Sequence, residues 1–268
     1  MTSGRIPGPG SLTHRYAADW RLGLVSRATL LLQVAHPVVG AGVAEHSDFV
    51  NDRWGRLTRT VNSTHAFFGF HGEERGREEA ARLREVHKHL KGVDAQGRRY
   101  HALDPEAYLW VHATLHHGMS EAQRLLGRPL DRGARLGLFS EWRALALALG
   151  ITERHLPADP DAFDAYFAKT ASEHLEDNPT VRLIIALDEK PYPPPPSWRL
   201  PSPVWNVPAL PLAAALRLCT AAALTPELRE RFGLSWSPAR RRRFDLFAAA
   251  ARRLPERGGP RPRTDGGR

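Results

Sequence analysis

Apolar residues in this chain recur mostly at helical spacing. One clear stripe lies between residues 73 and 90, where apolar or imidazole side chains follow an i, i+3, i+4, i+7 pattern: Leu83, Val86, His87 and Leu90. The alternation of Val, Ile and Tyr that marks strands is nearly absent. The pattern therefore predicts an all-α protein.

The same pattern, read with helix-start and helix-stop signals, predicts the individual helices. Asp104-Pro105 is a good helix start, because proline at the first helical position needs no hydrogen-bond partner. The chain is expected to bend at His36-Pro37, since the residue before proline resists the helical region. We expect helices over residues 14–34, 53–67, 73–90, 107–126, 140–149, 159–176, 180–188, 208–223 and 238–254.

The length of 268 residues suits one large domain with a substantial core. A proline run over residues 191–196 is a stiff, extended linker, and it joins two parts of one helical domain more plausibly than two domains. We predict a disordered start over residues 1–12, a single multi-helix domain over 13–254 with a proline-rich linker at 191–203, and a disordered basic tail over 255–268.

Composition narrows the class of protein. A single cysteine, Cys219, excludes an intrachain disulfide framework, a four-cysteine zinc site and a thiolate-held iron–sulfur cluster. No export signal stands at the start. The longest apolar stretch considered, Leu30 to Val43, is shorter than the roughly 20 residues that span a bilayer and contains His36 and Pro37. We therefore expect a cytoplasmic chain with no transmembrane segment.

The net charge of +9 is concentrated near the end of the sequence. Residues 229–268 hold twelve arginines against four acidic residues, including the run Arg240 to Arg243. Clustered arginines can bind nucleic acid or an anionic membrane. No helix-turn-helix, metal-finger spacing or aromatic stacking pattern accompanies them. A solvated surface and tail is the favoured interpretation, and no specific nucleic-acid partner is expected.

The segment richest in candidate chemistry is residues 33–47. It combines small residues, Gly40 to Ala44, with His36, His46 and Glu45, and it is followed by Arg56 and Thr60 one helical turn apart. Small side chains allow close approach of a bulky ligand to the backbone. The arrangement is typical of a cofactor pocket built on helices.

His87 lies in the apolar stripe of its predicted helix, so its imidazole needs a hydrogen-bond partner or a metal. Two interpretations stay open here: a core histidine with satisfied nitrogens, or an axial ligand to haem iron, which needs only one imidazole in an apolar pocket. Motifs for non-haem metals such as His-Glu-x-x-His are absent. Three further histidines, His112, His116 and His117, are structural or supporting candidates.

Several ordered blocks resemble the MpaB and latex-clearing-protein (rubber oxygenase) family. They are residues 35–47, Arg56-x-x-x-Thr60, Val86-His87-x-x-Leu90-x-Gly92, Asp104-Pro105, Trp110-Val111-His112-x-Thr114-Leu115 and residues 224–229. The resemblance covers residues 13 to about 254. It implies an all-helical, globin-like arrangement, haem b as cofactor, and oxidative cleavage of carbon–carbon double bonds in isoprenoid chains with dioxygen.

The resemblance also implies roles for particular residues. His87 would be the proximal haem ligand, and Arg56 and Thr60 would face the same pocket; a plain surface charge is the alternative for Arg56. Glu45 would be the catalytic carboxylate, with an ion pair to Arg56 or Arg59 as the alternative. Rubber oxygenases have a lysine at the position of Arg59, and a permanently charged guanidinium is a poor iron ligand. We therefore expect no distal lysine ligation.

These observations favour a haem-b-dependent oxygenase acting on a small hydrophobic, isoprenoid-like substrate and dioxygen. Polymeric rubber outside the cell is a poor candidate substrate for a chain without an export signal. Three other possibilities stay open: a helical haem or lipid carrier without turnover, a nucleic-acid-associated protein, and a scaffold that has lost its metal.

Overall fold

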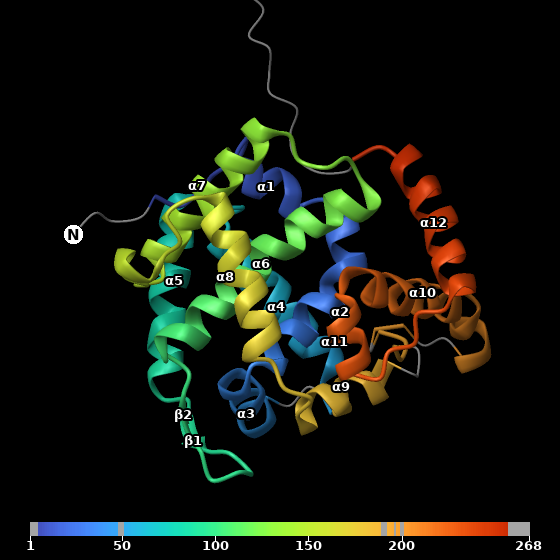
Figure 1. The fold of residues 1–268 in the computed structure, drawn as a ribbon, viewed down its shortest axis with the longest axis horizontal. Coiled ribbons are helices and arrows are strands. Elements are labelled where there is room, and N and C mark those ends of the chain that lie inside the picture. Colours follow the sequence, from blue (N-terminus) through green and yellow to red (C-terminus); the bar gives the residue numbers. More distant parts are fainter. Residues whose placement is uncertain (1–4, 48–50, 189–191, 196, 199–200, 257–268) are drawn as a thin grey trace, which may run out of the picture.

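The computed structural model describes residues 5–47, 51–188, 192–195, 197–198 and 201–256. Helices account for nearly all regular structure in this part of the chain (Figure 1). They are α1 (Leu12–Ala17), α2 (Trp20–Ala35), α3 (Pro37–His46), α4 (Arg53–Phe67), α5 (Glu73–Lys88), α6 (Pro105–Leu126), α7 (Arg132–Ala148), α8 (Pro160–Glu173), α9 (Pro179–Asp188), α10 (Ser202–Ala223), α11 (Pro226–Arg231) and α12 (Pro238–Arg253), with a 3-10 turn at Glu153–His155. The all-α prediction is confirmed, and the globin-like arrangement stays a prediction.

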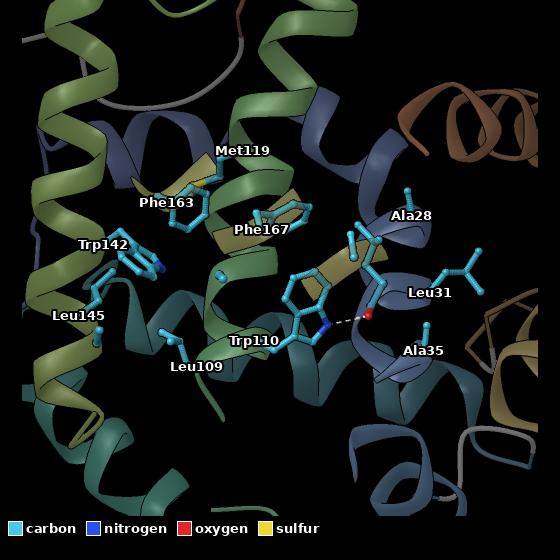
Figure 2. Packing of buried hydrophobic residues seen from close by; sticks show 14 of the residues in the cluster. Ala28, Leu31, Ala35, Leu109, Trp110, Met119, Trp142, Leu145, Phe163 and Phe167 are labelled. Atoms are coloured by element: carbon cyan, nitrogen blue, oxygen red, sulfur yellow. Dashed lines mark hydrogen bonds between the residues drawn. The ribbon is translucent and has the colours of Figure 1, made fainter. Parts of the chain in front are cut away.

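The core forms where α6 crosses α2, α7 and α8. Trp110 and Trp142 are almost wholly buried there, among Phe163, Phe167 and small residues of α2 (Figure 2). The Trp110 indole donates a hydrogen bond of 2.8 Å to the Leu32 carbonyl of α2. This bond satisfies the one polar atom of the ring, which is what allows a tryptophan to be buried completely.

The first predicted helix is divided in the structure. Residues 14–34 were expected to be one helix, but α1 ends at Ala17 and α2 begins at Trp20. Asp19 causes the break, because its carboxylate accepts the Arg21 backbone N–H and so caps a new helix. The predicted bend at Pro37 is confirmed, and α2 and α3 meet at 101°.

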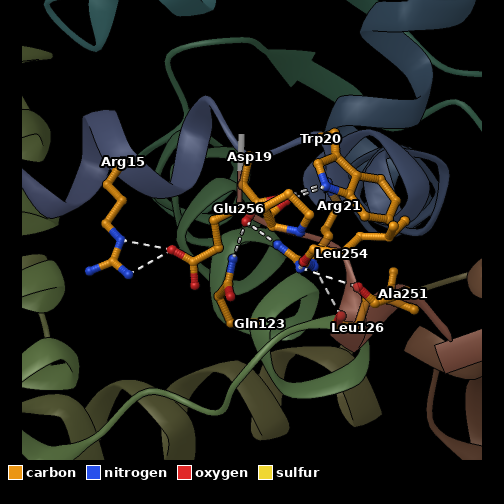
Figure 3. A network of polar contacts seen from close by, with 10 residues as sticks. Arg15, Asp19, Trp20, Arg21, Gln123, Leu126, Ala251, Leu254 and Glu256 are labelled. Carbon is orange, nitrogen blue, oxygen red and sulfur yellow. Dashed lines mark hydrogen bonds and ion pairs between the residues drawn. The ribbon is translucent and has the colours of Figure 1, made fainter. Parts of the chain in front are cut away.

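A buried polar network holds the N-terminal end of α2 against α6 and α12 (Figure 3). The Arg21 guanidinium is 2% exposed and pairs with Asp19 at 2.8 Å. It also donates to the carbonyls of Leu126 and Leu254, while Gln123 donates to the Asp19 carboxylate at 3.0 Å. With a further bond to the Ala251 carbonyl at 3.2 Å, all three nitrogens of this guanidinium donate, so α2, α6 and α12 are fixed to one another.

A β-hairpin, β1 (Lys91–Val93) and β2 (Arg99–His101), departs from the sequence prediction. It projects from the body of the protein beside α3 (Figure 1). Each strand is three residues long and is too short for an alternation pattern to be recognised in the sequence. The hairpin brings Tyr100 to α3, which matters for the site described below.

The segments predicted to be irregular are partly packed. Ile6, placed in the predicted disordered start, is 2% exposed and belongs to the core. Within the predicted linker, Tyr192 lies against α4, where its ring contacts Trp54 and lies 4.0 Å from the Arg53 guanidinium carbon. In the predicted tail, Glu256 pairs with Arg15. Residues 257–268 lie outside the described part of the chain.

One helix within the described ranges is long and apolar enough to cross a membrane by length and composition alone. This segment of α10, Pro203–Ala223, has a mean hydropathy of 1.3 over its most apolar window, and 28% of that window is buried. The bent pair α2 and α3 passes the same test if taken as one span. Of these helices, only α2 and α3 lie in the apolar stretch considered from the sequence, Leu30 to Val43, and α10 was not predicted as a candidate span.

Candidate functional site

Helices α4 and α5 form an antiparallel hairpin that carries three of the predicted site residues. A hydrogen bond joins the two helices: the Ser63 hydroxyl of α4 donates to the Glu79 carboxylate of α5. Glu79 is only 5% exposed and is also held by Arg82. These contacts lower the pKa of Glu79, with the Arg82 hydrogen bond as the main cause. The seam between the helices is therefore closed at this level.

The contact between Ser63 and Glu79 fixes which faces of the two helices oppose each other. On α4, Thr60 and Arg56 lie one and two turns before Ser63, on the same stripe. On α5, Val86 and His87 lie two turns after Glu79. The register of the two helices therefore places Arg56, Thr60 and His87 on the stripes that continue from the Ser63–Glu79 contact. That the three side chains address one pocket stays a prediction.

The seam is open at the end that carries these residues. Thr60 is exposed, and three large apolar side chains are exposed near it: Leu57 (41%), Val61 (39%) and Val86 (44%). The two helices are anchored to different parts of the protein at this end. The Trp54 indole donates to the Pro193 carbonyl, whereas Arg84 donates to the Ala148 carbonyl at the end of α7. An apolar, flat ligand could cover these side chains.

His87 is half-buried, and its ring has a defined orientation. Its Nδ1 lies 2.6 Å from the Leu83 carbonyl one turn earlier, so Nδ1 carries the proton and donates. The ring packs edge-to-face on Tyr108 of α6, with centroids 5.5 Å apart. Nε2 makes no hydrogen bond to the described residues. An imidazole held through Nδ1, with Nε2 free of hydrogen bonds, is the arrangement found in metal-ligating histidines.

Tyr108 adds a second unusual feature beside His87. Its hydroxyl is buried and has no hydrogen-bond partner within the described ranges. Burial raises the pKa of Tyr108 to about 12, so the hydroxyl keeps its proton. A buried donor without an acceptor costs about 1–3 kcal/mol. Such an orphaned hydroxyl is often satisfied by a ligand or a bound water.

The two arginines of α4 differ in their surroundings. Arg56 is partly buried, and burial lowers its pKa, while the nearby Tyr192 opposes this effect. Arg59 is 66% exposed and pairs with Asp52 at 2.9 Å. The carboxylate that Arg59 contacts is therefore Asp52 and not Glu45. Arg56 has the burial expected of a pocket residue, whereas Arg59 has that of a solvated surface charge.

Glu45 lies in a separate cavity. Its carboxylate accepts a short hydrogen bond from the Tyr100 hydroxyl, and His46 Nε2 lies 3.1 Å from the same hydroxyl. Burial and the bond to Glu45 raise the pKa of Tyr100 to about 12, so this phenol remains a donor at neutral pH. Gly92 passes so close to Glu45 and Tyr100 that a Cβ would not fit.

This cavity has a volume of about 290 Å³ and lies between α3, the β-hairpin and the start of α9. The small residues singled out in the sequence form one wall: Pro37, Gly40, Ala41 and Ala44. Arg56, Thr60 and His87 are not among its lining residues. The structure places Glu45 in this cavity and not at the α4–α5 seam, and its role as the catalytic carboxylate stays a prediction.

His112 and His116 of α6 are packed in the core. His112 Nε2 lies 2.9 Å from the Trp142 carbonyl, and the two rings stack. His116 is surrounded by Phe139, Trp142 and Phe163. Burial lowers the pKa of His112 to about 4 and that of His116 to about 3, so both rings are neutral at physiological pH. They stabilise the core and lie away from the seam's exposed apolar side chains.

Three residues of the α4–α5 seam and of the cavity beside α3 were not predicted from the sequence: Glu79, Tyr100 and Tyr108. Glu79 stood among other charged residues of an amphipathic helix, and only its buried contact with Ser63 distinguishes it. Tyr100 lies on the unpredicted hairpin. Among the residues that the structure describes, no three His, Cys, Asp or Glu side chains are grouped closely enough to hold a metal ion.

Comparison with known proteins is consistent with this architecture. The catalytic-domain model described as "ER-bound oxygenase mpaB/B'/Rubber oxygenase" matches residues 14–253. Two mycobacterial relatives, the uncharacterized proteins Rv2237 of Mycobacterium tuberculosis and Mb2261 of Mycobacterium bovis, are each 25% identical over 233 residues. These matches cover 85% of this chain and 87% of each relative. No solved structure matches. The chain belongs to the MpaB/rubber-oxygenase catalytic domain family.

Proposed function

We propose that this oxygenase-family protein binds haem b at the open end of the α4–α5 seam and oxidises an unsaturated hydrophobic substrate with dioxygen. The observation that carries the proposal is His87, whose Nδ1 is fixed by the Leu83 carbonyl while Nε2 remains free. Haem b needs one such imidazole and an apolar surround. The exposed Leu57, Val61 and Val86 supply the apolar surround.

The residues at the α4–α5 seam are suited to hold haem b. His87 would hold the haem iron through Nε2, and the hydrogen bond to the Leu83 carbonyl would increase the basicity of that nitrogen. Arg56, partly buried and positively charged, would pair with a propionate or orient an oxygen ligand. Thr60 presents a hydroxyl to the same seam. Bound haem supplies the iron chemistry with dioxygen; the protein supplies position, charge and exclusion of water.

The cavity beside α3 suits part of the substrate. The small residues of α3 form an apolar wall, and the Glu45–Tyr100 hydrogen bond places a fixed polar group beside it. Asp94, Arg98 and Asn178 add further polar groups to the lining. The Tyr100 hydroxyl keeps its proton and donates a hydrogen bond to the Glu45 carboxylate, which orients the Glu45 side chain. In this proposal Glu45 orients a polar end of the substrate or takes a proton at its carboxylate oxygen.

The proposed substrate is a small isoprenoid or unsaturated lipid. The cavity of about 290 Å³ is at the lower end of the range of ligand pockets and cannot enclose a long chain. A carrier that binds haem or a lipid without turnover is the second candidate. It is favoured by the separation of Glu45 from His87, because a carrier does not need the two residues side by side.

Oxygen uptake by the haem-reconstituted protein distinguishes the two candidates. An oxygenase should consume dioxygen in proportion to a short prenyl substrate and release carbonyl products that carry label from ¹⁸O₂. Glu45→Gln should lower turnover by at least about tenfold, the usual range for loss of a positioned acid or base, while haem content stays the same. Haem binding with no substrate-dependent uptake for any prenyl compound would favour the carrier.

A further inference from the structure

The first half of α10 presents an apolar surface to solvent. From residue 203 to residue 214 every exposed side chain is apolar, and no charged residue interrupts the segment. The largest exposed groups are Val204 (54%), Val207 (74%), Leu210 (51%) and Leu212 (55%). An exposed apolar patch of this kind on one helix usually marks a contact surface.

The opposite face of α10 is already occupied. Ala209 and Ala213 are buried, and the helix packs along α2 for much of its length. The exposed apolar half covers twelve residues, or about 18 Å at the helical rise, which is shorter than the roughly 30 Å hydrocarbon core of a bilayer. This half of α10 therefore has the dimensions of a helix that lies along a surface, with one face held by the protein.

Two tryptophans stand at the start of this surface. Trp198 is 55% exposed, and its ring packs edge-to-face on Trp205 with centroids 5.7 Å apart. The Trp205 indole donates to the Tyr192 carbonyl, which fixes its position. Tryptophan is enriched at the depth where lipid headgroups meet acyl chains. The aromatic pair thus extends the apolar patch with side chains suited to a membrane interface.

The positive charge needed for an anionic surface lies beside α10. The helix α12 starts next to α10 (Figure 1), and its Phe244 packs in one cluster with Leu216, Leu218 and Cys219 of α10. The run Arg240 to Arg243 is exposed in the first turns of α12. Arg241, Arg242 and Arg243 form no ion pair with a described residue. Cations at a helix N-terminus oppose the helix dipole, so an external anion would stabilise this end.

We propose that the exposed half of α10 and the arginine run of α12 dock the protein on an anionic lipid bilayer, with α10 lying in the plane of the headgroups. The apolar side chains of α10 enter the interface, and the arginines bind lipid phosphates. The proposal is independent of haem binding. It gives the arginine-rich region, interpreted above as a solvated surface, a partner of defined chemistry.

Vesicle sedimentation tests this surface with the full-length protein. The protein should sediment with phosphatidylcholine vesicles that contain phosphatidylglycerol, much less with phosphatidylcholine alone, and less as salt increases. The double variant Val207→Glu, Leu210→Glu should lose most of its binding to vesicles with phosphatidylglycerol and to vesicles without it. The double variant Arg241→Glu, Arg242→Glu should bind phosphatidylglycerol vesicles at least about tenfold more weakly.

A matched control comes from another helix. Leu136 is 49% exposed and belongs to α7, a helix that lies away from α10 (Figure 1), so Leu136→Glu should bind vesicles like the parent. Circular dichroism and sedimentation velocity show whether each variant is folded and in which assembly state. Unchanged vesicle binding by the Val207, Leu210 variant would overturn the proposal. Conversion of a dimer to a monomer in that variant, with vesicle binding retained, would assign the surface to self-association instead.

Discussion

At the scale of single residues, the contrast between His87 and the other histidines is informative. His112 and His116 are enclosed by aromatic rings, whereas His87 is fixed through Nδ1 and keeps Nε2 open. The stripe that contains His87 could be predicted from spacing alone, because residues three and four apart share a helix face. The tautomer could not, since it depends on the i−4 carbonyl contact of the folded helix.

Arg21 provides a residue-scale test of the fold. Arg21→Met removes a buried cation and leaves Asp19 buried without its partner, so the free energy of unfolding should fall by about 3–5 kcal/mol. The control is Arg15→Met, because the Arg15 side chain is 53% exposed and its ion pair should contribute no more than about 1 kcal/mol. Urea unfolding followed by circular dichroism measures both. Equal losses for the two variants would show that the network does not hold α2, α6 and α12 together.

At the scale of elements, α3 depends on close packing against its neighbours. Gly40 approaches the Val34 carbonyl and lies so near Asn178 that an added Cβ would come within 2.6 Å of Nδ2. A Cβ at Gly42 would meet only the Tyr100 ring at 3.8 Å, an ordinary contact. Packing therefore requires a glycine at position 40 but not at position 42, although both residues belong to the same small-residue segment.

Gly40→Ala and Gly42→Ala form a matched pair that tests this packing. Gly40→Ala should lower the free energy of unfolding by about 1–3 kcal/mol, because the added methyl forces α3 away from α9. Gly42→Ala should leave it unchanged or raise it by up to about 1 kcal/mol, since alanine is the better helix former. Thermal and urea unfolding report both changes. A larger loss for Gly42→Ala than for Gly40→Ala would contradict the arrangement of α2, α3 and α9.

Element boundaries were predicted well where local signals act and poorly where tertiary contacts decide. The range of α4 was predicted correctly from its apolar spacing. The start of α10 was placed at 208 and lies at Ser202 in the structure. The predicted helix began at Pro208, whereas in the structure both Pro208 and Pro211 lie inside α10. The carbonyls that these prolines leave without a hydrogen-bond partner belong to the exposed Val204 and Val207 and can be hydrated.

At the scale of the whole molecule, several neutral histidines make stability depend on pH. Burial lowers the pKa of His36 to about 4, as it does for His112, and that of His116 to about 3, all from 6.5. The unfolded chain binds protons at these sites as the pH falls below 6.5, whereas the folded protein does not. Their contribution to stability is therefore complete above pH 6.5 and is lost as the pH falls toward 4.

The variant His116→Phe measures one part of this dependence. Each buried histidine contributes up to about 1.4 kcal/mol of stability loss per pH unit within that window. Phenylalanine suits the surrounding Phe139, Trp142 and Phe163, so the variant should remain folded and lose stability less steeply between pH 6.5 and 4. Urea unfolding at several pH values gives the slope. An unchanged slope would show that His116 is protonated in the folded protein.

The arrangement of the whole molecule also decides which features of the site could be predicted from the sequence. The family and the helical class follow from ordered motifs and periodicity. The separation of Glu45 from Arg56 and His87 does not, because it depends on the 101° turn between α2 and α3 and on a hairpin of two three-residue strands. Both features are set by contacts between segments far apart in the chain.

The pyridine haemochrome and Soret spectra of the haem-reconstituted protein test the central claim most directly. The parent and His89→Ala, whose side chain is 76% exposed at the C-cap of α5, should bind one b-type haem per chain with the same spectrum. His87→Ala should lose haem or show a changed axial ligand that added imidazole restores. Equal haem content and identical spectra in His87→Ala and the parent would contradict the assignment of His87 and with it the proposed site.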